Sequence, residues 1–196
     1  MSNQWHKYFI LQKMTTFVAM VRDISFHITD IFFNSVKAVS TEVKVEVCSC
    51  VDYFEFRISD NGCGMSSQRL SEVLSATHSE CNDGWGIILL KQSIERCGGD
   101  FSLESEEGCG TVVWARFPMG KSNSLEVGDL AQTLALILTG SPGVSVCLRL
   151  VGGNGKFEIS TSDLESVEQG LPLSHVKVTT LVKELLNNKL KKMFWG

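Results

Sequence analysis

Apolar residues recur along this chain with two periods, one typical of helices and one typical of strands. Within residues 27–38 they fall three or four positions apart, which predicts an amphipathic helix over 23–39. Segments 42–50 and 53–59 alternate apolar and polar residues around a short turn, which predicts a hairpin. Further helices are predicted over 66–74, 86–97, 127–138, 162–169 and 176–190, and further strands over 101–105, 111–117, 144–151 and 156–160.

The order of these elements predicts the architecture. Three helices and two hairpins between residues 20 and 118 are typical of an α/β sandwich with a mixed sheet. The polar residues 119–125 indicate a linker. Residues 126–196 then contain a smaller set of predicted helices around one further hairpin. We therefore predict a two-layer α/β sandwich followed by a smaller C-terminal helix–hairpin–helix unit.

The most informative segment joins strand 53–58 to Asp-Asn-Gly-Cys-Gly at 60–64. Asp60 ends the strand, at the floor of a cleft, where its carboxylate could accept a hydrogen bond from an amino group on a heterocycle. Gly62 and Gly64 would let the backbone turn tightly and approach a ligand without interference from a Cβ atom. Taken alone, this short pattern fits an ordinary glycine-rich loop equally well.

Two further segments add candidate chemistry. Asp30, Asn34 and Lys37 lie on one stripe of the first helix, where they could hold a metal ion, a water and a phosphate, or form a solvated face. Downstream, Gly84 and Gly86 open a helix. The free N–H groups and dipole at such a start can receive a phosphate, although an ordinary helix begins in the same way.

Together with a glycine turn at 107–111, these segments resemble the N, G1 and G2 boxes and the trailing G-x-G-T element of the GHKL ATPase superfamily. That superfamily includes gyrase B, mismatch-repair ATPases, large heat-shock chaperone ATPases and histidine kinases. The resemblance covers residues 21–117 and is more specific than any one motif. Residues 20–38, 127–131 and 170–175 also resemble small stand-alone ATP-binding proteins found beside bacterial iron-hydrogenase genes.

The resemblance implies a Bergerat-type sandwich over residues 20–118, with ATP and Mg²⁺ as cofactors. Asp60 would accept the adenine amino group with support from Thr111, and Asn34 would coordinate magnesium, a hard cation that favours oxygen ligands. Gly84 and Gly86 would hinge a lid over the phosphates. The complete set implied for nucleotide binding is Asn34, Lys37, Asp60, Gly62, Gly64, Gly84, Gly86 and Thr111.

Catalysis is less well supported than binding. Asp30 stands where gyrase-like members carry a glutamate general base, and aspartate is one methylene shorter. Residues 71–86 contain no lysine or arginine, whereas phosphoryl transfer relies on cations that stabilise the transferring group. His78 either substitutes weakly for such a cation or is a solvated loop residue.

The resemblance therefore implies an ATP- and Mg²⁺-binding regulatory protein of signal transduction, similar to a histidine kinase ATPase domain, with weak or partner-dependent phosphoryl transfer. None of the four histidines lies on a long two-helix stretch before the nucleotide motifs, so autophosphorylation in cis is not expected. Two alternatives remain open. One is a non-catalytic nucleotide-sensing module whose C-terminal unit contacts a protein partner, and the other is a serine kinase like the anti-sigma-factor kinases.

Composition narrows the setting. The net charge is −4 with no basic run, so nucleic acid is not an expected partner. The seven cysteines show no C-x-x-C spacing, which disfavours zinc and iron–sulfur sites and indicates reduced thiols in a bacterial cytoplasm. Among them, Cys48 and Cys50 lie on the same face of a strand.

The N-terminus carries an apolar segment over residues 8–21 that polar residues interrupt. It is too short and too polar to span a membrane, and it lacks the cleavage signature of a signal peptide. Because the family resemblance begins at Met20, we treat residues 1–19 as an N-terminal extension. If folded, it could add an edge strand or mediate formation of a homodimer.

Overall fold

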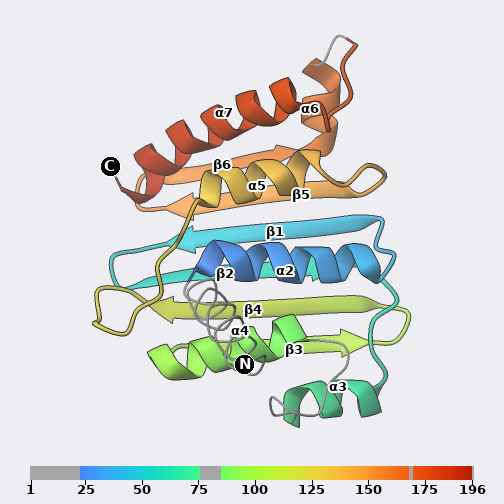
Figure 1. The fold of residues 1–196 in the computed structure, drawn as a ribbon, viewed down its shortest axis with the longest axis vertical. Helices are drawn as coiled ribbons and strands as arrows, with labels where there is room; N and C mark the ends of the chain where they lie inside the picture. The colour runs from blue at the N-terminus through green and yellow to red at the C-terminus, as the bar shows by residue number, and fades with distance from the viewer. Residues whose placement is uncertain (1–22, 76–84, 168–169, 196) are drawn as a thin grey trace, which may run out of the picture.

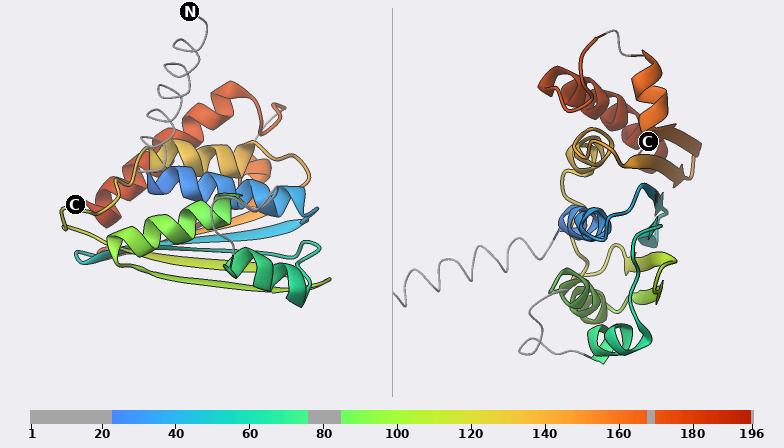
Figure 2. Two further views of the ribbon diagram at one scale, coloured as in Figure 1. Left: turned by 60° about the horizontal axis from the view of Figure 1, so that its bottom comes forward. Right: turned by 90° about the vertical axis from the view of Figure 1, so that its right-hand side faces the viewer.

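The computed structural model describes residues 23–75, 85–167 and 170–195. In this part of the chain six strands form one sheet in the order β3-β4-β2-β1-β5-β6. Helices α2, α4, α5 and α7 lie side by side on one face of the sheet, and none of the helices described covers the opposite face (Figure 1, Figure 2). The predicted two-layer α/β sandwich is confirmed.

The first half of the sheet is built from antiparallel pairs. Helix α2 (Ile24–Lys37) is followed by strands β1 (Glu42–Ser49) and β2 (Tyr53–Asp60), which pair as the predicted hairpin. After two further helices, α3 and α4, come strands β3 (Asp100–Glu106) and β4 (Gly110–Pro118). Strand β4 pairs antiparallel with both β3 and β2. Strand β2 therefore lies between β1 and β4, as one of the two central strands of the sheet.

Helix α2 begins at an N-cap that its sequence provides, and it ends at Lys37, two residues before the predicted end. Asp23 caps it by accepting a hydrogen bond from the Ser25 N–H at 2.7 Å, which satisfies one of the unpaired N–H groups of the first turn. Its buried apolar residues, spaced three or four apart, face the sheet and are Ile24, Ile28, Ile31 and Phe32.

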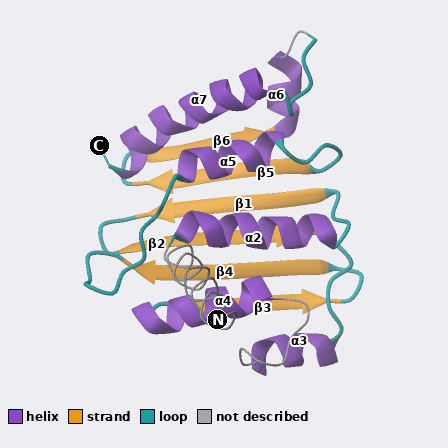
Figure 3. Ribbon diagram, in the orientation of Figure 1, coloured by secondary structure: helices purple, strands orange, loops and turns teal. Residues whose placement is uncertain are grey.

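Two helices frame the lower part of the sheet in Figure 3, α3 (Ser67–Ser75) and α4 (Trp85–Cys97). Helix α4 ends at Gly98, which has a φ of 72°, a left-handed conformation that glycine adopts at little cost. Gly99 follows, and a Cβ atom there would lie 2.1 Å from the Arg116 carbonyl oxygen. The two glycines therefore end the helix and bring the chain directly onto the sheet.

The C-terminal residues contain the predicted helix–hairpin–helix elements, but their hairpin belongs to the same sheet. Strand β5 (Ser145–Gly152) pairs parallel with β1, from Glu42 opposite Ser145 to Cys48 opposite Val151. The sequence did not predict this pairing. The other elements are α5 (Leu130–Thr139), β6 (Gly155–Ser160), α6 (Thr161–Val167) and α7 (Val176–Phe194).

Some boundaries differ from the prediction. Helix α5 starts three residues late because Gly128 has a φ of 77° and Asp129 then caps the helix. Helix α7 continues to Phe194, beyond the predicted end. The N-terminal extension and residues 168–169 of the helix predicted over 162–169 lie outside the described residues.

One apolar core runs between the sheet and the helices along the whole sheet. It includes Phe56 of β2, Leu148 of β5 and Leu186 of α7, each fully buried. Within the described residues, no helix is long and apolar enough to cross a membrane. The core is therefore continuous between strands β1–β4 and the C-terminal strands β5 and β6.

We predict that Leu148→Ala destabilises the whole fold by about 2–5 kcal/mol, the usual cost of deleting a buried leucine side chain. Denaturant unfolding followed by fluorescence and far-ultraviolet circular dichroism would measure this, and both signals should move together. Leu181→Ala is the control, because Leu181 is 66% exposed and its truncation should change the free energy of unfolding little. Two separate transitions, with only one shifted by Leu148→Ala, would contradict a single core.

Candidate functional site

A small cleft of about 150 Å³ opens where α2 meets the ends of β2 and β4. Its walls are mostly apolar, and its polar groups come from α2, from the end of β2, from α3 and from β4. Such a mixture of apolar walls and few convergent polar groups is typical of a small-molecule site. The lining residues are Ile31, Asn34, Ser35, Ala38, Asp60, Gly64, Met65, Arg69, Val73, Ile87, Thr111 and Val113.

Asp60 is the most strongly held of these side chains. Its Oδ2 accepts a hydrogen bond from the Ser35 hydroxyl at 2.7 Å, and its Oδ1 accepts one from the Gly62 N–H at 2.9 Å. The Ser40 hydroxyl lies 3.1 Å from Oδ1 and 2.7 Å from the Ser35 carbonyl oxygen, so these two acceptors share its single proton. A carboxylate offers about four acceptor sites, which leaves room for a donor from the cleft.

Thr111 lies directly opposite Asp60 on the neighbouring strand β4. Its hydroxyl is 2.9 Å from the Ser105 hydroxyl, and the Ser105 oxygen also accepts the Met65 N–H at 2.9 Å. Thr111 therefore stands beside Asp60, and its support of a bound base stays a prediction. Ser35, Ser40 and Ser105 were missed, because a lone serine carries no motif.

The glycines of the loop after β2 are required by protein backbone rather than by open space. A Cβ atom at Gly62 would lie 2.8 Å from the Ala38 carbonyl oxygen, and one at Gly64 would lie 1.9 Å from the Glu106 carbonyl oxygen. Gly64 also has a φ of 64°. Of the two, only Gly64 lines the cleft, and the close approach of both to a nucleotide stays a prediction.

The polar stripe of α2 is partly gathered at the cleft. Asn34 lines it, whereas Lys37, at the end of the helix, does not. Asp30 is half-buried one turn before Asn34. Burial raises the pKa of the Asp30 carboxyl above its usual range, and the nearby Lys37 ammonium opposes part of this rise.

The start of α4 packs against Asp30. A Cβ atom at Gly86 would lie 1.4 Å from the Asp30 Oδ2, so a larger residue would force the Asp30 side chain to move. The structure thus brings together Asp30 and Gly86, two residues that the sequence predicted for one site. Gly84 and His78 of the predicted lid lie outside the described residues.

One cation at the cleft was not predicted. Arg69 of α3 lines the cleft, and its guanidinium forms an ion pair with Glu72 at 3.5 Å. Arg69 lies two residues before the segment 71–86, which contains no lysine or arginine. Its place on a helix beside the glycine loop was the only signal in the sequence.

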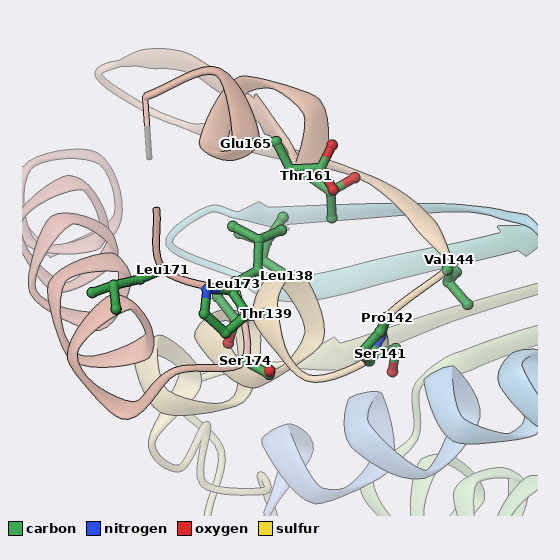
Figure 4. Close-up of a pocket in the computed structure, with 12 residues that line it drawn as sticks. Leu138, Thr139, Ser141, Pro142, Val144, Thr161, Glu165, Leu171, Leu173 and Ser174 are labelled. Carbon is green, nitrogen blue, oxygen red and sulfur yellow. The ribbon is translucent and has the colours of Figure 1, made fainter. Parts of the chain in front are cut away.

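A larger hollow of about 340 Å³ lies among α5, α6 and the segment before α7 (Figure 4). Its lining combines apolar residues such as Leu138 and Leu173 with the hydroxyls of Ser141 and Thr161 and the carboxylate of Glu165. These groups form no catalytic constellation. The chemistry predicted from the sequence is therefore concentrated in the smaller cleft at Asp60.

Comparison with known families identifies the family of the region that contains this cleft. Residues 22–121, about half of the chain, match the family of histidine kinase-, DNA gyrase B- and HSP90-like ATPases. The chain belongs to this ATPase family. The matched region runs from before α2 to just after β4 and therefore contains every residue that lines the cleft.

Individual relatives agree with the family. The chain is 31% identical over 83 residues to the sensor protein DegM of Bacillus sp. (strain B21-2), covering 41% of this chain and 22% of that protein. It is 26% identical over 90 residues to a probable C4-dicarboxylate sensor kinase of Bacillus subtilis (strain 168), covering 44% of this chain and 17% of that protein. These matches span about a fifth of the length of each relative.

A solved structure is similar beyond the matched region. The crystal structure of the N-terminal domain of a DNA repair protein aligns with a TM-score of 0.52 at 10% identity, covering 77% of this chain and 54% of that chain. At this identity the likeness shows the fold alone. The predicted kinship with proteins beside iron-hydrogenase genes stays a prediction.

The raised pKa of Asp30 predicts a pH-dependent cost to this ATPase-family fold. Below the ordinary carboxyl pKa of 3.8, Asp30 is neutral in both folded and unfolded chains. As pH rises through the higher folded pKa, ionisation costs more in the folded chain, so stability falls. Asp30→Asn mimics the neutral form and should raise the melting temperature at pH 7, with a difference that shrinks towards pH 4.

Thermal melts across this pH range would measure the difference. The matched control is Asp52→Asn, because Asp52 is exposed in the turn between β1 and β2 and its replacement should leave the pH profile unchanged. An Asp30→Asn melting temperature equal to that of the parent at every pH would contradict a desolvated carboxyl at this position.

Proposed function

We propose that this chain binds ATP together with Mg²⁺ in the cleft around Asp60 and serves as a regulatory domain in signal transduction. The observation that carries the proposal is the Asp60 carboxylate, held from behind by Ser35 and Gly62 with acceptor capacity left towards an apolar cleft. The sensor proteins among the relatives support the regulatory role.

The cleft suits the adenine base. The exocyclic amino group of adenine is a hydrogen-bond donor, and Asp60 is an acceptor whose orientation is fixed before binding. Ile31, Met65 and Val113 line the same cleft and offer apolar surface to a flat ring. Thr111 beside Asp60 would support the base, directly or through a water molecule.

The phosphates would extend along α2 towards the start of α4. Magnesium usually keeps several waters and is bound through substrate phosphates with one or two protein ligands, so one amide oxygen from Asn34 suffices. The N-terminus of α4, which begins at Trp85 beside Gly86, would present the N–H groups of its first turn and a favourable dipole to the phosphates. Lys37 would add a positive charge nearby.

Phosphoryl transfer would be weak or would depend on a partner. Asp30 is placed beside the start of α4, and its raised pKa brings it closer to the range in which a general base works well. Its side chain remains short for this role. The charge of a transferring phosphoryl group calls for a cation at the phosphates. Arg69 lines the cleft on the side of α3, away from the proposed path of the phosphates along α2.

The main alternative is a nucleotide-sensing module without catalysis, which contacts a protein partner through its C-terminal part. Exposed apolar side chains on α7 favour such a contact, since Val176 is 77% exposed and Leu181 is 66% exposed. A serine-kinase activity like that of the anti-sigma-factor kinases is the second alternative, in which the partner receives the phosphate.

We predict that Asp60→Asn weakens ATP binding by about 1.5–3 kcal/mol, the scale of a lost charge-assisted hydrogen bond. Isothermal calorimetry with ATP and Mg²⁺ would measure this. ADP binding should weaken by the same amount, because the adenine base is common to both ligands. Asparagine keeps the shape of the side chain and can still accept from the Gly62 N–H, and a melting curve would confirm that the variant folds.

Asn34→Ala is the contrasting variant in the same measurement. It should weaken binding of ATP with Mg²⁺ more than binding of ADP, and omission of Mg²⁺ should abolish the difference between this variant and the parent. If the parent and Asp60→Asn bind ATP with equal affinity, the adenine site is ruled out. If the parent binds ATP equally well with and without Mg²⁺, only the role of Asn34 is ruled out.

Incubation with γ-labelled ATP and Mg²⁺ would distinguish the alternatives. We predict that the purified chain hydrolyses ATP at below about one turnover per minute, because positioning and electrostatics supply nearly all catalysis of this transfer. Asp30→Asn should lower the rate further. Brisk hydrolysis by the chain alone would contradict the proposal of weak turnover, and label on an added partner would favour the kinase alternative.

A further inference from the structure

Two cysteine thiols and a tyrosine hydroxyl gather at the turn between β1 and β2. Cys48 is the next-to-last residue of β1, and the Cys50 N–H donates to the Tyr53 carbonyl oxygen at 2.9 Å, which closes the turn. Cys48 and Cys50 line one hollow, and the proximity of Cys50 contributes to the raised pKa of both the Cys48 thiol and the Tyr53 hydroxyl. The three side chains therefore form one cluster rather than isolated groups.

The spacing of the two cysteines permits a disulfide. Residues two apart on a strand lie about 6.6–6.8 Å apart between Cα atoms, the upper end of the usual disulfide range of about 4.4–6.8 Å. A disulfide formed at the edge of the allowed geometry is easily reduced, which is typical of reactive rather than structural bonds.

The cluster opens onto a hollow of about 470 Å³ that is separate from the cleft at Asp60. Both cysteines line it, together with the turn between β5 and β6 and the last residues of α7, including Phe194. Cys50 is exposed and Cys48 is half-buried. Tyr53 and Asp60 end the same strand at opposite ends, about 23 Å apart from the strand rise, so a reagent at the thiols would leave the nucleotide cleft open.

We propose that Cys48 and Cys50 form a thiol–disulfide exchange site whose substrates are low-molecular-weight disulfides of the glutathione class. The hollow beside the thiols has room for a small peptide-like molecule. Its lining of glycine backbone and the side-chain oxygen of Asn154 offers hydrogen-bonding groups to such a molecule, while the Asn154 nitrogen donates to the Lys192 carbonyl oxygen at 2.9 Å. The site is distinct from the proposed nucleotide site and does not depend on it.

The exchange proceeds in two balanced steps. The Cys50 thiolate attacks one sulfur of the small disulfide, forms a mixed disulfide and releases one small thiolate. The Cys48 thiolate then attacks the Cys50 sulfur, forms the Cys48–Cys50 disulfide and releases the second small thiolate. The two leaving thiolates take up the two protons lost by the cysteines, and two electrons pass from the protein to the small disulfide.

The environment assigns the order of attack. Cys50 is the exposed thiol and meets the reagent first. Burial, Glu55 and Cys50 raise the pKa of the Cys48 thiol. A smaller fraction of Cys48 is therefore thiolate, so its attack on the Cys50 sulfur is the slower, second step. Contact with Cys50 raises the pKa of the Tyr53 hydroxyl to about 12, so this hydroxyl stays protonated beside the reacting sulfur.

Peptide mapping of the full-length protein tests the proposal. The protein is incubated with oxidised glutathione, quenched in acid, alkylated and digested with trypsin. Cleavage after Lys44 and Arg57 gives the peptide 45–57, which contains Cys48, Cys50 and no other cysteine. We expect this peptide to lose two hydrogens, to resist alkylation and to regain both thiols after treatment with dithiothreitol.

Three serine variants make the result decisive. Cys48→Ser should leave a stable glutathione mixed disulfide on Cys50, because the second attack is removed. Cys50→Ser should greatly reduce modification of the peptide. Cys147→Ser is the matched control and should behave as the parent, since the Cys147 thiol lies against Glu158 on the same face of the sheet.

Two outcomes would overturn the proposal. The first is that Cys48 and Cys50 of the parent stay fully alkylatable while other exposed cysteines react. The second is that Cys48→Ser and the parent give the same mixed disulfide, which would show two independent thiols. ATP affinity measured on the oxidised protein reports separately on the nucleotide site, so failure of either proposal can be recognised without the other.

Discussion

The hydrogen bonds to the Asp60 carboxylate are the interaction on which the site depends. They tie the end of β2 to the Ser35 hydroxyl of α2 and to the Gly62 N–H of the following loop. A half-buried carboxylate is costly unless its acceptor sites are satisfied. The same bonds that satisfy it also fix the spacing between helix and sheet, and this spacing creates the cleft.

Glycines also shape this arrangement, because at three separate points two segments of the chain approach each other too closely for a side chain. Gly62 packs on Ala38, Gly64 packs on Glu106, and Gly86 packs on Asp30. The first two contacts involve backbone atoms that cannot move aside, and Gly64 also has a positive φ. These close approaches help to set the shape of the cleft, which Gly64 lines.

The two proposed sites lie near opposite ends of strand β2. The carboxylate proposed to recognise a nucleotide lies at the end of β2, and the thiols proposed to exchange with disulfides lie near its beginning. The family match ends at residue 121, yet β5 extends the same sheet through its parallel pairing with β1. The C-terminal part therefore supports the wall of the thiol hollow and the core under the nucleotide site alike.

The sequence by itself determined the elements and the central motif. Periodicity is local, so it placed α2, the hairpin of β1 and β2, and Asp60 at the end of a strand. Tertiary structure alone decided that Glu46 of β1 meets Arg149 of β5, 103 residues away, and that Ser35 and Arg69 face the same cleft. These contacts depend on which faces become buried together, and no pattern of neighbouring residues records that choice.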